Sequence, residues 1–156
     1  MESRYLIVIV TVIVIVAIVA YLFSQTRITT VDTAVLNERF GVVSVAVANV
    51  TYYAYLANTP ALREEGYMNV TGLGNCDAHT PCIGMLFTFQ NQTSLCFWME
   101  NTPIPLRQTW LNQSGYPTYT YVGTPYSKRA ICSYGQYVIE TAPNTTIGGR
   151  VAIKSV

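Results

Sequence analysis

The chain has 156 residues, of which 51% are hydrophobic and 11% are charged, and its formal net charge is +1. About a quarter of the residues in a typical soluble domain are charged, so charge is scarce here. No cluster of Lys and Arg is present, which argues against a nucleic-acid partner, because binding to the phosphate backbone needs clustered positive charge.

The first predicted element is an apolar segment near the N-terminus. No charged residue lies between Arg4 and Arg27, and Thr11 is the only polar side chain from Leu6 to Ala20. A helix of about 20 apolar residues spans the hydrocarbon core of a bilayer, whereas an isolated strand would leave its amides unpaired in lipid. The segment therefore predicts a single membrane-spanning helix. A cleaved secretory signal peptide is the alternative interpretation.

The apolar helix is expected to continue beyond the length that a bilayer needs. Apolar residues recur at helical spacing as far as Val35, and Gly41 follows where a helix C-terminal glycine belongs. A break near Thr29 is the alternative, because the residues around it are β-branched. The sequence thus predicts two parts: a hydrophobic helix, either membrane anchor or filament core, at residues 1–40, and an extracellular β domain at residues 41–156.

The composition changes after residue 41 to short β-branched and aromatic runs separated by turn residues. Runs of this length and spacing are typical of an all-β domain. They predict six or seven strands in an antiparallel sandwich of the immunoglobulin-like kind. The predicted fold class is therefore α+β, a long N-terminal hydrophobic α-helix followed by this sandwich. The runs lie at residues 42–50, 51–56, 83–90, 93–99, 116–122, 129–140 and 146–153.

Four cysteines lie beyond the apolar segment, which indicates two disulfides in an oxidising compartment. They are Cys76, Cys82, Cys96 and Cys132. Three connectivities are possible, and we favour a short loop between Cys76 and Cys82 with a longer bridge between Cys96 and Cys132. The rival interpretation is a zinc site built from Cys76, His79 and Cys82. The spacing is not the usual one for zinc, so we expect no metal.

Five Asn-x-Ser/Thr triplets, all beyond the apolar segment, are candidate glycosylation sites on an exported surface. The alternative is that Asn, Ser and Thr simply fill turns. Together with the cysteines, the triplets predict an extracellular location for the β domain. The triplets begin at Asn49, Asn69, Asn91, Asn112 and Asn144.

The sequence offers few groups for catalysis. His79 is the only histidine, and the one adjacent acidic pair is Glu64-Glu65 in a polar turn. No Gly-rich phosphate loop follows a predicted strand. We therefore expect no enzyme, no catalytic residue and no cofactor. Tyrosines are dense at residues 52–55 and 116–121, which leaves a carbohydrate-binding tyrosine face as an alternative and surface glycans as candidate partners.

A short polar N-terminus, a long apolar helix and a β domain with disulfides resemble the layout of a type IV pilin, particularly the archaeal kind. The resemblance is architectural, and Tyr5 stands where bacterial pilins carry a glutamate. It implies a structural subunit of an extracellular filament that is held in the membrane before assembly and then binds copies of itself. The residues expected to pack between helices in the filament core are Tyr5, Leu6, Ile9, Ile13, Val16, Val19 and Phe23. The alternative function is a single-pass membrane-anchored ectodomain, such as an adhesin, a receptor or a virion envelope protein.

Overall fold

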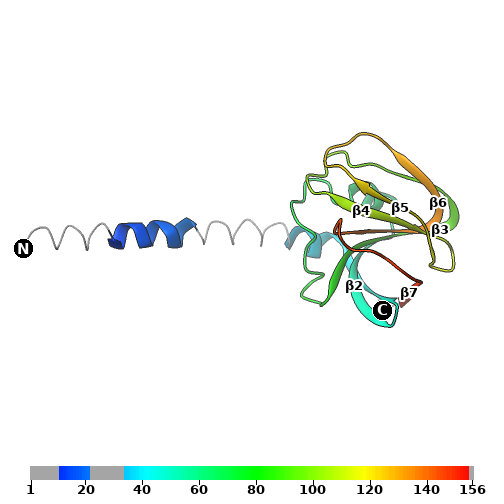
Figure 1. Ribbon diagram of the computed structural model, residues 1–156, viewed down its shortest axis with the longest axis horizontal. Coiled ribbons are helices and arrows are strands. Elements are labelled where there is room, and N and C mark those ends of the chain that lie inside the picture. The colour runs from blue at the N-terminus through cyan, green and yellow to red at the C-terminus, as the bar shows by residue number, and fades with distance from the viewer. Residues whose placement is uncertain (1–10, 22–33, 155–156) are drawn as a thin grey trace, which may run out of the picture. The chain divides into compact units, whose positions relative to one another are not determined.

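The computed structural model describes residues 11–21 and 34–154 of the chain. They belong to two compact units, Met1–Val31 and Asp32–Val156. In the first unit, residues 11–21 are helical and their side chains are exposed. The second unit contains the sheet shown in Figure 1.

The prediction of one long hydrophobic N-terminal helix is wrong. In the part of the chain that the structure describes, no helix is both long and apolar enough to cross a membrane. Residues 34–39 are helical, but they belong to the second unit, where Leu36 and Phe40 are buried in the core. These two residues therefore pack with the sheet instead of extending an apolar N-terminal helix.

Only part of the predicted helix–helix contact set can be placed. Ile13, Val16 and Val19 lie on the described helix and are exposed. The other four residues of that set, Tyr5, Leu6, Ile9 and Phe23, lie outside the described residues.

Seven strands form a single mixed sheet in the order β5-β4-β6-β3-β2-β1-β7. β2 and β3 are parallel, and the other neighbouring pairs are antiparallel. The strands are β1 (Gly41–Val47), β2 (Val50–Ala57), β3 (Cys82–Phe97), β4 (Leu106–Leu111), β5 (Pro117–Gly123), β6 (Ile131–Thr141) and β7 (Val151–Lys154). The predicted immunoglobulin-like sandwich is therefore wrong. Six of the seven strands overlap the predicted runs, but β4 was not predicted, and β3 joins two runs that were predicted as separate strands.

The parallel pair explains why the sandwich prediction failed. Parallel strands need a crossover, and here the connection from β2 to β3 contains the short helix α2 (Pro60–Glu65). The Thr59 side chain accepts a hydrogen bond from the Leu62 amide at 3.2 Å, and Pro60 occupies the first helical turn. Thr and Pro at these positions are typical of a helix start as well as of a turn. The sequence alone had suggested a turn.

The sheet buries side chains on both faces, because successive residues of each strand point to opposite sides. On one face Tyr55, Phe87 and Trp110 pack with Leu36 and Phe40. On the other face a second cluster draws residues from six of the seven strands. That cluster comprises Val43, Val45, Val47, Ala54, Ile83, Leu86, Leu111, Ile139, Ile147 and Val151.

The sheet curls so that its two ends approach each other, which gives a half-barrel. The amide of Val151, at the start of β7, donates to the carbonyl of Gly115 in the β4–β5 turn at 2.9 Å. Arg150 Nε donates to the Ser114 carbonyl at 2.9 Å. Gly115 has a φ of +81°, and a Cβ there would lie 2.1 Å from the Val151 carbonyl oxygen. Glycine is thus required for this close approach.

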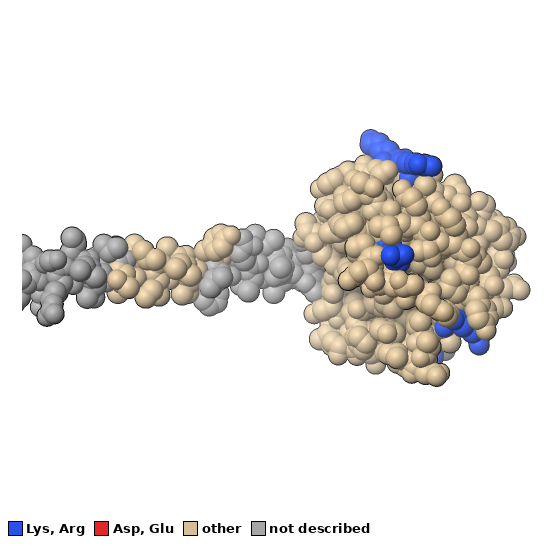
Figure 2. Space-filling view, in the orientation of Figure 1, with Lys and Arg blue, Asp and Glu red and all other residues tan. Residues whose placement is uncertain are grey.

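Basic side chains are few on the face of the molecule drawn in Figure 2, where they form separate spots rather than a continuous patch. This pattern accords with a chain that has 9 basic and 8 acidic residues.

Candidate functional site

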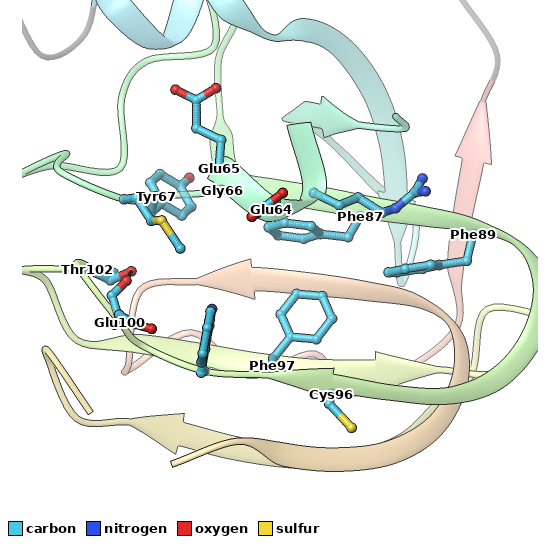
Figure 3. A pocket seen from close by; sticks show the side chains of 13 residues that line it. Glu64, Glu65, Gly66, Tyr67, Phe87, Phe89, Cys96, Phe97, Glu100 and Thr102 are labelled. Carbon is cyan, nitrogen blue, oxygen red and sulfur yellow. Dashed lines mark hydrogen bonds between the residues drawn. The ribbon is translucent and has the colours of Figure 1, made fainter. Parts of the chain in front are cut away.

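A groove of about 310 Å³ lies between α2 with the turn after it and the strongly bent strand β3 (Figure 3). Ligand pockets generally start at about 300 Å³ and combine aromatic walls with a few polar groups. Its lining residues are Arg63, Glu64, Glu65, Gly66, Tyr67, Met68, Phe87, Phe89, Cys96, Phe97, Trp98, Glu100 and Thr102.

The aromatic wall comes from two stretches of β3 and the residue after it. Phe97 meets Phe87 edge to face with ring centroids 4.9 Å apart, and it meets the buried Trp110 behind it at 5.7 Å. The Trp110 indole N–H donates to the Leu95 carbonyl at 2.9 Å, so this ring is fixed in place. Trp98 is 47% exposed. The wall therefore has a rigid base and one accessible indole.

Arg63 of α2 holds the opposite side of the groove in place. Its Nη1 donates to the carbonyls of Asn58 at 2.8 Å and Thr88 at 2.9 Å. Its guanidinium carbon lies 4.7 Å from the centroid of the Phe89 ring. These contacts join α2 to β3 and engage Arg63 Nη1 and the guanidinium group within the protein.

Three carboxylates lie at the rim, and two of them are paired. Glu65 forms an ion pair with Arg39, and Glu100 forms one with Lys128 at 3.1 Å. Glu64 is exposed and has no ion pair among the described residues. The rim thus offers hydrogen-bond acceptors while its charges are largely balanced.

A buried acid lies in the core. Glu140 of β6 is 4% exposed, and Gln108 Nε2 of β4 donates to its Oε1 at 2.9 Å. Burial raises the pKa of the Glu140 carboxyl from its ordinary value of 4.5 to about 7, although the Gln108 hydrogen bond opposes this. Burial and the negative charge of Glu140 together hold the pKa of the Tyr67 hydroxyl well above 10.0.

The structure pairs Cys76 with Cys82 and Cys96 with Cys132, which are the two pairs favoured from the sequence. Because Cys76 and Cys82 are oxidised, they are not thiolates that could bind zinc. No metal-binding cluster occurs within residues 11–21 and 34–154. Cys96 and Cys132 lie opposite each other on β3 and β6 and are both exposed. In Figure 3 the Cys96 sulfur points away from Phe97 and Phe87.

The two tyrosine-dense stretches have different environments. Tyr55 is buried, and its hydroxyl accepts from the Cys76 amide at 3.0 Å and donates to Asn37 Oδ1 at 2.6 Å. Burial raises the pKa of this phenol. In the second stretch Tyr116 and Tyr119 are 53% and 44% exposed. The structure does not bring the two stretches into one face, because β2 and β5 are separated by three strands.

Four of the five predicted glycosylation sites are exposed: Asn49, Asn69, Asn91 and Asn144. Asn112 is half-buried, and its Oδ1 accepts from the amides of Ser114 and Tyr116 at 3.0 and 2.9 Å. The side-chain oxygen of Asn112 is therefore held by backbone amides of the β4–β5 turn. Occupancy of all five sites remains a prediction.

Most residues of the groove were not singled out by the sequence. Glu64 was noticed only as part of an acidic pair in a turn, and Trp98 only as part of a strand. The two come together because β3 bends back under α2. The one available signal was the adjacent Phe97-Trp98 pair close to Glu100, an arrangement that mixes rings with a carboxylate.

The chain belongs to the DUF192 family, described as Uncharacterized ACR, COG1430, which it matches over residues 42–152. It is similar in structure to a candidate transcription regulator from Sinorhizobium meliloti 1021, with a TM-score of 0.58 and 25% identity, covering 72% of this chain and 92% of that one. It is also similar to a protein of unknown function from Novosphingobium aromaticivorans DSM 12444, with a TM-score of 0.57 and 22% identity, covering 71% and 83%. No curated protein matches the chain.

These relationships overturn the pilin interpretation. The β domain is that of DUF192, and neither structural relative is described as a pilin. The filament-subunit function and its membrane-anchored alternative are both wrong, because their basis was a long apolar helix joined to a sandwich. The layout that suggested them requires only an apolar stretch before a disulfide-containing β domain, and many unrelated chains meet that description.

Proposed function

We propose that the DUF192 domain is an exported, non-catalytic binding module whose groove holds a neutral, amphipathic ligand such as a sugar ring of a glycan. The observation that carries this proposal is that the half-exposed Trp98 lines the same groove as Glu64 and Glu100. A sugar ring has an apolar C–H face and a hydroxyl edge. The indole suits the face, and carboxylate oxygens accept hydrogen bonds from the hydroxyl groups.

The charge of the rim favours a neutral ligand over an ion. Glu65 and Glu100 are neutralised by Arg39 and Lys128. Arg63 donates to backbone carbonyls and lies against Phe89. Of the three rim carboxylates only Glu64 has no ion pair among the described residues, so the rim carries little unbalanced charge that would attract an ion.

Two features support a binding role without catalysis in an exported location. The groove lining contains no serine, histidine or free thiol, and its one cysteine, Cys96, is in a disulfide. Two disulfides and four exposed Asn-x-Ser/Thr sites suit an oxidising, glycosylating compartment. Transcription regulation, the role suggested for the Sinorhizobium relative, is not carried over, because this chain lacks a basic cluster.

A glycan array probed with the full-length chain tests the proposal, followed by ligand-observed NMR of the sugars that bind. We expect saturable binding of neutral glycans with no release of shortened products. An array without bound glycans would overturn the ligand class, and hydrolysis of a bound glycan would overturn the non-catalytic role.

A further inference from the structure

A second hollow, of about 390 Å³, lies on the β7–β1–β2 end of the sheet. Its six lining residues are Val42, Ser44, Thr51, Tyr53, His79 and Lys154, and none of them is acidic. We propose that this hollow binds an oxyanion, namely the carboxylate, sulfate or phosphate group of a ligand.

The register of the sheet sets three of the donors in one row. Ser44 of β1 lies directly opposite Tyr53 of β2 and directly opposite Lys154 of β7. Directly opposite residues of neighbouring strands project to the same face of a sheet. An ammonium group and two hydroxyls therefore follow one another across three strands, and Thr51 adds a hydroxyl two residues from Tyr53.

His79 completes the hollow from a restrained loop. The Cys76–Cys82 disulfide closes this loop, and the His79 amide donates to the Cys76 carbonyl at 3.0 Å. The His79 ring lies 4.9 Å from the Tyr53 ring, and its Nδ1 is 3.1 Å from the same Cys76 carbonyl oxygen. A carbonyl only accepts, so Nδ1 carries the proton.

These donors have no acceptors of their own. Among the described residues, the side chains of Ser44, Thr51, Tyr53 and Lys154 have no hydrogen-bond or ion-pair partner. Donors that converge without an acceptor or a carboxylate are complementary to an oxyanion, which has only acceptors. The tyrosine and histidine rings flank the row, which leaves room for the carbon skeleton of the ligand.

The test uses the ¹⁵N-labelled full-length chain with both disulfides intact. Sodium sulfate, phosphate and acetate are titrated separately, with sodium chloride at matched ionic strength as the blank. We expect saturable shifts at the amides of Ser44, Tyr53 and His79 with at least one oxyanion. Saturation by the tetrahedral ions assigns a sulfate or phosphate ligand, and saturation by acetate assigns a carboxylate.

The chain offers a matched control, because Lys128 and Lys154 are its only two lysines. Lys154→Gln should weaken binding about tenfold or more, because a charged hydrogen bond is lost. Lys128→Gln should leave it unchanged, and Ser44→Ala should weaken it less than Lys154→Gln. The proposal is overturned if no oxyanion exceeds the chloride response, or if both lysine variants lose affinity equally, which would indicate an unspecific charge effect.

Discussion

Gln108 on β4 lies directly opposite Glu140 on β6, and the amide nitrogen of Gln108 donates to the Glu140 carboxyl at 2.9 Å. The other end of the same amide, Gln108 Oε1, is buried without a hydrogen-bond partner. A protonated carboxyl could donate to this oxygen while still accepting from the nitrogen. The unpartnered Gln108 oxygen and the raised pKa of Glu140 therefore both favour a protonated, neutral Glu140 carboxyl.

The Glu140 carboxyl makes stability depend on pH. Its folded pKa, about 7, is above its ordinary value of 4.5, so the folded state binds the proton more tightly than the unfolded chain. The stabilisation that this tighter proton binding gives to the folded state is fully present below pH 4.5 and is lost as the pH rises to about 7. We expect Glu140→Gln to raise the free energy of unfolding at pH 8 by about 3 kcal/mol, because glutamine is isosteric with the neutral acid.

Urea unfolding at pH 4.5, 6 and 8 measures this effect. Glu64→Gln is the control, because Glu64 is an exposed acid on α2, and it should retain the pH dependence of the parent chain. If the free energy of unfolding of Glu140→Gln depends on pH as in the parent chain, another group is responsible for the pH dependence.

Removing the accessible indole of the groove should abolish most of its affinity. Trp98→Ala takes away the 47% exposed ring, and we expect glycan affinity to fall about tenfold or more. Thermal stability should change little, because half of the side chain is already in solvent. Tyr134→Ala is the matched control, as Tyr134 is an aromatic residue of β6 that is 60% exposed outside the groove. Equal losses in both variants would contradict the assignment.

Gly84 on β3 should not tolerate a side chain. Its φ is +139°, and a Cβ there would lie 2.0 Å from the backbone oxygen of Glu140. Gly84→Ala is expected to destabilise the domain by about 3 kcal/mol or more, because backbone on both strands must shift. Gly148→Ala, where nothing lies within 4 Å, should be close to neutral. Similar melting temperatures for the two variants would show that β3 adapts easily.

The two disulfides should differ in their access to a reductant. Cys96 and Cys132 are both exposed, whereas Cys76 is 0% exposed. Limited treatment with a phosphine followed by alkylation and peptide mass mapping should label Cys96 and Cys132 first, because attack needs an accessible sulfur. Earlier labelling of Cys76 and Cys82 would instead indicate that the loop around His79 opens readily.

The sequence predicted local elements better than their assembly. The alternation of Val43, Val45 and Val47 indicated a strand because burial on one face repeats every two residues. The order of the strands could not be read in this way, since Ser44 pairs with both Tyr53 and Lys154. The two cysteine pairs were favoured from the sequence among three possible connectivities, and the structure contains both.

The groove was missed because its lining residues come from segments that are far apart in the sequence. Glu64 and Trp98 belong to different elements, and only the bend of β3 and the crossover through α2 bring them to one hollow. No periodicity within either segment indicates that Glu64 and Trp98 line the same hollow. The apolar stretch near the N-terminus, by contrast, was a strong local signal that suggested the wrong family when combined with a general layout.

The pairing of β7 with β1 also affects how the domain can be made. Of the seven described strands β1 is synthesised first and β7 last, so one edge of β1 has no neighbour until β7 has been made. During that interval its valine-rich backbone could pair with another nascent chain. Export before folding, or a chaperone that shields this edge, would therefore favour a correctly closed domain.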